Sequence, residues 1–89
     1  MLIALDYDGT YTADPVLWED FICIAKARGH EVVVATMRYP SESIALVDDT
    51  VRVVYTSRCA KRPALLELGL LVAIWIDDNP HWINQDAAW

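Results

Sequence analysis

The stretch that decides the fold is residues 1–10, Met-Leu-Ile-Ala-Leu-Asp-Tyr-Asp-Gly-Thr. A short apolar run that ends in a polar turn signal is typical of a buried strand. We predict a strand that ends at Asp6, whose side chain then projects from the carboxyl edge of the sheet, where open α/β sheets bind ligands. Asp8 follows closely, and two neighbouring carboxylates repel each other unless a cation or a shared proton relieves them. A plain strand followed by an Asp-Gly turn also explains these residues.

Three more apolar segments, at residues 31–36, 51–55 and 70–76, are predicted to be strands. Predicted helices alternate with them. Their ranges are 15–28, 41–47, 63–68 and a brief turn within 81–89. This alternation predicts the α/β class, with a parallel sheet of about four strands in a single three-layer Rossmann-like domain over residues 1–89.

The first predicted helix has clear start and packing signals. Asp14 followed by Pro15 is typical of an N-cap and a first helical residue. The apolar face expected to pack on the sheet consists of Leu17, Phe21, Ile24 and Ala25, and Cys23 is expected to pack there too. In the second predicted helix, Ser41 is the expected cap, and Ile44 and Val47 are expected to face inward.

Composition narrows the classes of function. The chain has 89 residues, which fits one small domain, and 55% of them are hydrophobic. The net charge of −6 disfavours nucleic-acid binding through a basic face. No apolar run reaches the length of a membrane helix, and no secretory signal is visible. Cys23 and Cys59 are too few and too far apart for a disulfide framework or a zinc site. We therefore expect a cytoplasmic protein that does not bind membranes.

Part of the negative charge is local. Asp6, Asp8, Asp77 and Asp78 account for four of the 13 acids, and the other nine nearly balance the seven basic residues. An excess of acids confined to two tight clusters favours a cation site over a generally acidic surface.

Right-handed crossovers bring the carboxyl ends of parallel strands to one edge of the sheet. Asp6, Thr36, the loop around Lys61 and Asp77 are therefore expected to converge there. Paired acids, a hydroxyl and a lysine suit phosphoryl transfer. Carboxylates can hold Mg²⁺ and provide a nucleophile, while the hydroxyl and the lysine take up phosphoryl oxygens.

These residues resemble the motifs of the haloacid dehalogenase (HAD) superfamily of phosphotransferases, in the family order and over nearly the whole chain. The first motif, an apolar strand running into DxDGT, matches residues 2–10. The second, an apolar strand ending in Thr or Ser, matches residues 32–36. Lys61 matches the lysine of the third motif, and residues 74–78 match the strand that ends in two acids.

The resemblance implies roles for single residues. Asp6 would be the nucleophile that forms an aspartyl-phosphate, and Asp8 the general acid and base. Thr36 and Lys61 would hold phosphoryl oxygens. Mg²⁺ would be bound by Asp6, by the backbone carbonyl of Asp8, and by Asp77 and Asp78. The residues expected to contact the substrate are Gly9, Thr10 and Arg38. Arg58 and Arg62 compete with Lys61 for the third-motif position.

The chain departs from the family pattern because neither a substrate-specificity cap nor a fifth core strand is visible. An open site suits a phosphorylated substrate large enough to cover it, such as a protein or the phosphorylated end of a nucleic acid. A second subunit could serve as the lid instead, with Trp82 and Trp89 at the interface of a homo-oligomer.

We therefore predict a Mg²⁺-dependent phosphomonoester hydrolase without a cap. The first alternative is a catalytically weak or inactive HAD-like protein that binds phosphate or Mg²⁺ and acts through partners. A receiver-like phosphorylation switch also uses clustered Asp, Thr and Lys residues, but the order of the motifs and the short chain argue against it.

Overall fold

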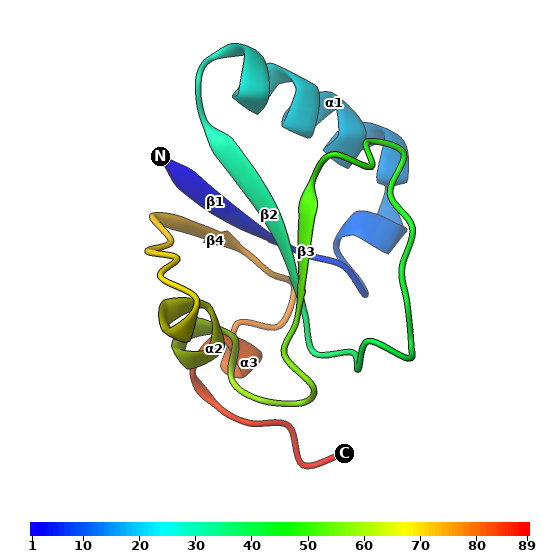
Figure 1. The fold of residues 1–89 in the computed structure, drawn as a ribbon. Helices are drawn as coiled ribbons and strands as arrows, with labels where there is room; N and C mark the ends of the chain where they lie inside the picture. The colour runs from blue at the N-terminus through cyan, green and yellow to red at the C-terminus, as the bar shows by residue number, and fades with distance from the viewer.

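A computed structural model describes all residues, 1–89. The chain forms a small α/β domain with four parallel strands, consistent with a Rossmann-like fold (Figure 1). The elements in chain order are β1 (Leu2–Asp6), the 3₁₀ helix η1 (Tyr11–Ala13), α1 (Pro15–Ala27), β2 (Glu31–Thr36), β3 (Arg52–Tyr55), α2 (Lys61–Glu67), β4 (Ile74–Ile76) and α3 (His81–Asn84). None of these helices has the length and apolar character needed to span a bilayer.

The strand order is β3-β2-β1-β4, so the first strand is central and the last strand lies beside it. Leu5 pairs with Val34 of β2 on one side and with Ile76 of β4 on the other. This register places the end of β1 next to the end of β4, although the two strands are far apart in the sequence. The prediction that four strand ends share one edge is confirmed.

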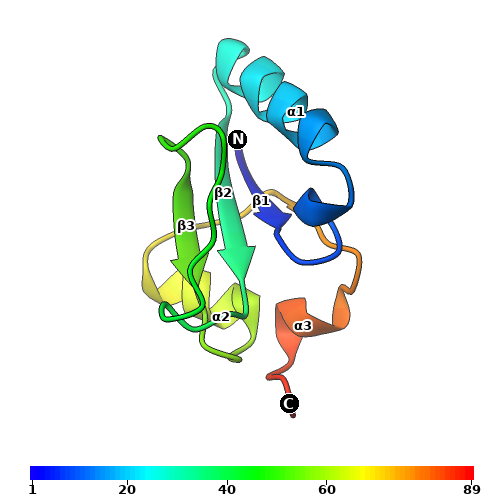
Figure 2. The same ribbon diagram turned by 90° about the vertical axis from the view of Figure 1, so that its right-hand side faces the viewer.

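Alternate residues of the strands pack on opposite faces of the sheet, as the two-residue period of a strand requires. On one face, Leu5 and Val34 pack with Ile22 and Ala25 of α1. On the other face, the core residues are Ala4, Val33, Ala35, Val54 and Leu65 of α2. Figure 2 shows α2 and α3 near the carboxyl ends of the strands, whereas α1 lies along the sheet.

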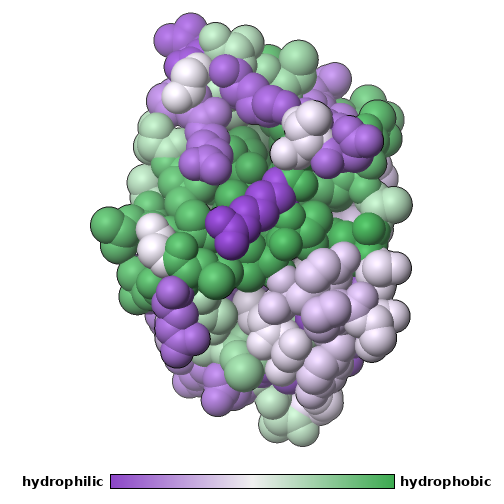
Figure 3. All heavy atoms as spheres, in the orientation of Figure 1, coloured by the Kyte–Doolittle hydropathy of each residue, from purple (hydrophilic) through white to green (hydrophobic).

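The short helix α2 leaves part of the second face without a helical cover. Leu2 and Val72 are only half-buried there, and Leu71 is 76% exposed. Figure 3 shows apolar atoms across the middle of the face that Figure 1 presents.

Helix α1 begins as predicted, because the Asp14 side chain accepts a hydrogen bond from the backbone N–H of Leu17 at 3.2 Å. Its predicted buried face was partly wrong. Leu17 and Ile24 are exposed, and Trp18 and Ile22 pack against the core together with Phe21 and Ala25. Positions 18, 21, 22 and 25 have the same helical spacing, and the helix is rotated by about one residue relative to the prediction. Cys23 therefore faces outward and is exposed, contrary to the prediction.

The helix predicted over residues 41–47 is wrong, because this segment is irregular. Its backbone donors find partners on other elements. The Ile44 N–H donates to the Tyr55 hydroxyl, and the N–H groups of Val47 and Asp48 donate to the Glu19 carboxylate. Ile44 packs on the core as predicted, but Val47 is 82% exposed. A seven-residue helix gains little on its own, so these contacts decide the conformation.

The fourth strand was predicted over residues 70–76, but only Ile74–Ile76 forms a ladder with β1. Residues 70–73 approach the sheet irregularly, and Leu70 and Val72 pack against its second face. The apolar run is therefore longer than the paired strand, and its residues are at most half-buried.

Candidate functional site

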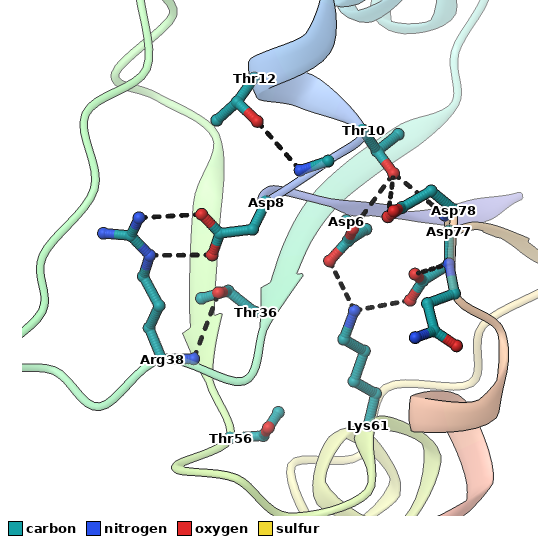
Figure 4. Close-up of polar contacts among 12 residues, drawn as sticks. Asp6, Asp8, Thr10, Thr12, Thr36, Arg38, Thr56, Lys61, Asp77 and Asp78 are labelled. Carbon is teal, nitrogen blue, oxygen red and sulfur yellow. Dashed lines mark hydrogen bonds and ion pairs between the residues drawn. The ribbon is translucent and has the colours of Figure 1, made fainter. Parts of the chain in front are cut away.

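Lys61 lies between two acids at the carboxyl edge of the sheet. Its Nζ is 2.6 Å from Asp6 Oδ1 and 2.6 Å from Asp77 Oδ2 (Figure 4). Asp6 ends β1, Asp77 follows β4, and Lys61 begins α2, so three elements meet here. Only 2% of Lys61 is exposed, and a buried ammonium of this kind requires compensating carboxylates.

Asp78 joins the group through Thr10. The Thr10 hydroxyl lies 3.1 Å from Asp6 Oδ2 and 3.0 Å from Asp78 Oδ1, and it accepts a hydrogen bond from the Asp78 N–H. Gly9 lies directly behind Asp78: a Cβ at this glycine would be 2.5 Å from Asp78 Oδ2. Gly9 and Thr10 do not line the cavity in front of the acids. Both were predicted to contact the substrate, which stays a prediction; in this structure both lie next to Asp78.

Burial raises the pKa of the Asp6 carboxyl to about 7, although the neighbouring Lys61 ammonium acts in the opposite direction. A hydrogen bond from Asp6 lowers the pKa of Asp78. The pKa values of the two acids are thus moved in opposite directions, and Asp6 takes up a proton more readily than Asp78. When all three acids are ionised, Lys61 balances only one of their charges.

The same three acids fit a hard divalent cation. Asp6, Asp77 and Asp78 each offer one carboxylate oxygen, and these oxygens lie within 4.8 Å of one another. Mg²⁺ prefers oxygen ligands and is often held by a few carboxylates together with waters and substrate oxygens. Two uncompensated negative charges also match one divalent ion.

The carboxylate of Asp8 lies apart from this cluster. Figure 4 shows Asp8 turned toward Arg38, while Asp6 points to Lys61. Arg38 donates two hydrogen bonds to Asp8, from Nε at 2.9 Å and from Nη2 at 2.8 Å. The Arg38 guanidinium also lies 5.2 Å from the centre of the Tyr7 ring. These contacts raise the pKa of Arg38, chiefly through its hydrogen bonds to Asp8.

A cavity of about 160 Å³ opens in front of the acids. It is lined by predicted site residues, namely Asp6, Asp8, Thr36, Arg38, Lys61, Asp77 and Asp78. Thr36 ends β2 and is almost completely buried, and its hydroxyl accepts a hydrogen bond from the Arg38 N–H at 3.3 Å. The fold therefore brings the predicted phosphate-binding residues to the same cavity.

The other two basic candidates have different partners. Arg58 forms an ion pair with Glu42 at 3.0 Å and donates a hydrogen bond to the Met37 carbonyl. Arg62 donates to the Asn84 side chain. Of the three basic residues considered for the third motif, only Lys61 contacts the acids of the site, Asp6 and Asp77.

Two features of the site were not predicted from the sequence. Trp82 and Trp89 line the cavity, which the sequence did not indicate, and their place at the interface of a homo-oligomer stays a prediction. The bidentate pair between Asp8 and Arg38 was also missed, because the choice of rotamer depends on neighbours that sequence spacing does not reveal. The only feature of the sequence that could have indicated the tryptophans of the cavity is that Trp82 and Trp89 follow Asp77 and Asp78 in the chain.

Comparisons of the chain with protein-family models, with curated proteins and with solved structures found no match.

Proposed function

We propose that this chain is a Mg²⁺-dependent phosphomonoester hydrolase of the HAD type, without a cap. The observation that carries the proposal is the contact of one lysine with two acids at the carboxyl edge of the sheet, next to a third acid. The three carboxylates have oxygens within 4.8 Å of one another, and Lys61 is 2.6 Å from two of them. The order of the motifs in the sequence supports the same assignment.

In the proposed reaction, a carboxylate oxygen of Asp6 attacks phosphorus and the bond from phosphorus to the leaving oxygen breaks. Asp8 donates a proton to that oxygen, so an alcohol leaves and an aspartyl-phosphate remains. Asp8 then accepts a proton from water as the water attacks phosphorus. The bond between phosphorus and Asp6 breaks, and inorganic phosphate is released with both acids restored.

Other residues of the cavity stabilise charge during these steps. Lys61 and the Thr36 hydroxyl donate to the phosphoryl oxygens, which carry the developing charge. Mg²⁺, held by Asp6, Asp77 and Asp78, would supply further positive charge next to the phosphoryl group. Asp77 and Asp78 themselves do not react.

Asp8 has to leave Arg38 and take up a proton from solvent before it can protonate the leaving oxygen. An incoming phosphoryl group offers the Arg38 guanidinium a second anion with which it can make paired hydrogen bonds. We infer that the phosphoryl group competes for Arg38 and thereby frees Asp8. Arg38 would then contact the substrate, as the sequence predicts.

The test is hydrolysis of an aryl phosphate by the full chain with Mg²⁺. We expect turnover that EDTA abolishes and that Asp6→Asn reduces by at least about a thousandfold, because the nucleophile is lost. Asp20→Asn is the matched control, since Asp20 is an exposed acid of α1 outside the cavity. Activity that survives Asp6→Asn would contradict the mechanism.

The second candidate is a phosphate- or Mg²⁺-binding protein without turnover. The pair between Asp8 and Arg38 favours it, because the proposed proton donor is held by two hydrogen bonds. Absence of hydrolysis across aryl, sugar and nucleotide phosphates, together with measurable Mg²⁺ binding, would support this candidate over the first.

A further inference from the structure

The cavity that contains the acids has an aromatic wall. Trp82 of α3 and Trp89 line it together with Lys61 and Asp77. The two rings meet edge to face, with their centroids 6.3 Å apart. Two indole rings and a lysine that can bind an anion therefore line the same cavity.

The segment that carries Trp89 is attached to the body of the domain at two points. The Asp86 carboxylate accepts a hydrogen bond from the Ala60 N–H at 2.7 Å, next to Lys61. The Ala87 N–H donates to the Arg58 carbonyl at 2.8 Å. These bonds hold the segment against the loop before α2, so Trp89 is placed at the cavity by specific contacts.

Arg58 supports the ring of Trp89 from one side. Its guanidinium carbon is 4.4 Å from the centre of the Trp89 ring and 4.9 Å from that of Tyr39. The guanidinium is itself fixed by Glu42 and by the Met37 carbonyl. Stacking of this kind orders the indole in advance, which lowers the entropy cost of binding a ligand against it.

The supported ring nevertheless remains open to solvent. Trp89 is 66% exposed, while Trp82 is half-buried. An exposed indole beside a polar cavity leaves an apolar surface in water that a flat ring can cover.

We propose that Trp82 and Trp89 bind the leaving group of the substrate, and that the substrate is a phosphomonoester whose leaving group carries a planar aromatic ring. This inference rests on the proposed function and narrows its substrate class. The phosphoryl group enters among Asp6, Lys61 and Thr36, and the ring stacks on the tryptophan wall. A leaving group without a ring, such as glycerol, would leave the wall exposed to water.

The first experiment compares substrates with and without a ring in Trp89→Ala, Trp89→Phe and the unchanged chain. Stacking on an aromatic side chain changes affinity by about 5- to 150-fold. We expect Trp89→Ala to lower kcat/KM for phenyl phosphate or nucleoside monophosphates at least about fivefold more than for glycerol phosphate. Trp89→Phe keeps a ring and should retain most of the preference. Trp18→Phe, on α1 outside the cavity, is the control.

The same comparison distinguishes the source of the ring. A preference for nucleoside monophosphates over phenyl phosphate indicates a nucleobase, and the reverse indicates an aryl group. An equal loss for glycerol phosphate and for ring-bearing substrates in Trp89→Ala overturns the inference, even if hydrolysis itself is confirmed.

The second experiment does not depend on turnover. Binding of a nucleoside monophosphate, of phenyl phosphate and of inorganic phosphate is measured by calorimetry in the presence of Mg²⁺. We expect Trp89→Ala to weaken binding of at least one ring-bearing ligand about fivefold or more and to leave inorganic phosphate unaffected. This result without any hydrolysis would support the aromatic subsite and refute the hydrolase proposal. Unchanged binding of both ring-bearing ligands would refute the subsite.

Discussion

At the scale of single residues, the acid cluster depends on a position that carries no side chain. Gly9 has a φ of +84°, a conformation that other residues rarely adopt. Its missing Cβ also leaves the space that the Asp78 carboxylate occupies. The Asp-Gly pair was predicted as a turn, and the turn is confirmed. Its second role could not be predicted, because it requires knowing that Asp78 lies 2.5 Å from the absent atom.

We predict that Gly9→Ala weakens both stability and the metal site. The positive φ and the contact with Asp78 should together lower the free energy of unfolding by about 1–3 kcal/mol. Urea unfolding measures this loss, and titration with Mg²⁺ measures the displacement of Asp78. Gly29→Ala is the matched control, because Gly29 also has a positive φ, of +82°, but has no atom within 4 Å of its would-be Cβ. If both variants bind Mg²⁺ equally, Gly9 does not position Asp78.

The sequence pattern predicted that Lys61 meets the acids of the site, but it did not predict the orientation of Asp8. Asp6, Lys61 and Asp77 were expected together because parallel strands end at one edge, and they do meet there. The orientation of Asp8 depends on Arg38, which lies on the loop after another strand, so local spacing carried no information about it.

At the scale of elements, the connection between β2 and β3 is held by side chains of α1 in addition to hydrogen bonds within the connection. The Glu19 carboxylate accepts from the N–H groups of Val47 and Asp48 and from the Tyr11 hydroxyl. Lys26, also on α1, pairs with Asp48 at 2.8 Å. Helical periodicity could not predict these contacts, because both partners come from residues that are distant in sequence. Strands β1 and β2 were predictable, since continuous apolar runs reflect burial on both faces.

We predict that Glu19→Ala releases this connection. Three donors lose a charged acceptor, which should lower the free energy of unfolding by about 2 kcal/mol. Limited proteolysis should then cut within residues 37–51, and urea unfolding should give the size of the loss. Asp20→Ala is the control, because it removes the neighbouring acid of α1, which forms no ion pair. Equal protease resistance of the two variants would show that the connection is held by other contacts.

At the scale of the whole molecule, the site connects the central strand β1 with the edge strand β4 through their ends. Asp6 belongs to β1, whereas Asp77 and Asp78 follow β4. The α/β class, the parallel sheet and the shared edge were predictable, because strand and helix patterns alternate along the chain. Two features could not be predicted from the sequence: a helix of only seven residues covers the second face, and two tryptophans form one wall of the cavity. Both depend on how α2, α3 and the last residues pack together.

We predict that Mg²⁺ stabilises the whole domain against heat. A ligand at about a hundred times its dissociation constant adds about 2.7 kcal/mol to the free energy of unfolding. In a domain of this size that corresponds to a rise in Tm of about 10 °C or more. Asp77→Asn should lose most of the rise, and EDTA should reverse it in the unchanged chain. Asp20→Asn should behave like the unchanged chain. A similar rise in Asp77→Asn would place Mg²⁺ elsewhere.

The strand order β3-β2-β1-β4 also has a consequence for the time course of folding. The partner of β1 on one side, β2, is made early during synthesis, whereas its partner on the other side, β4, begins only at Ile74. Contacts across such separations form slowly, because a long loop has to close first. A partly synthesised chain can therefore pair β1 with β2 and still lack every acid that β4 delivers. The cluster of three carboxylates can therefore form only after β4 has paired with β1.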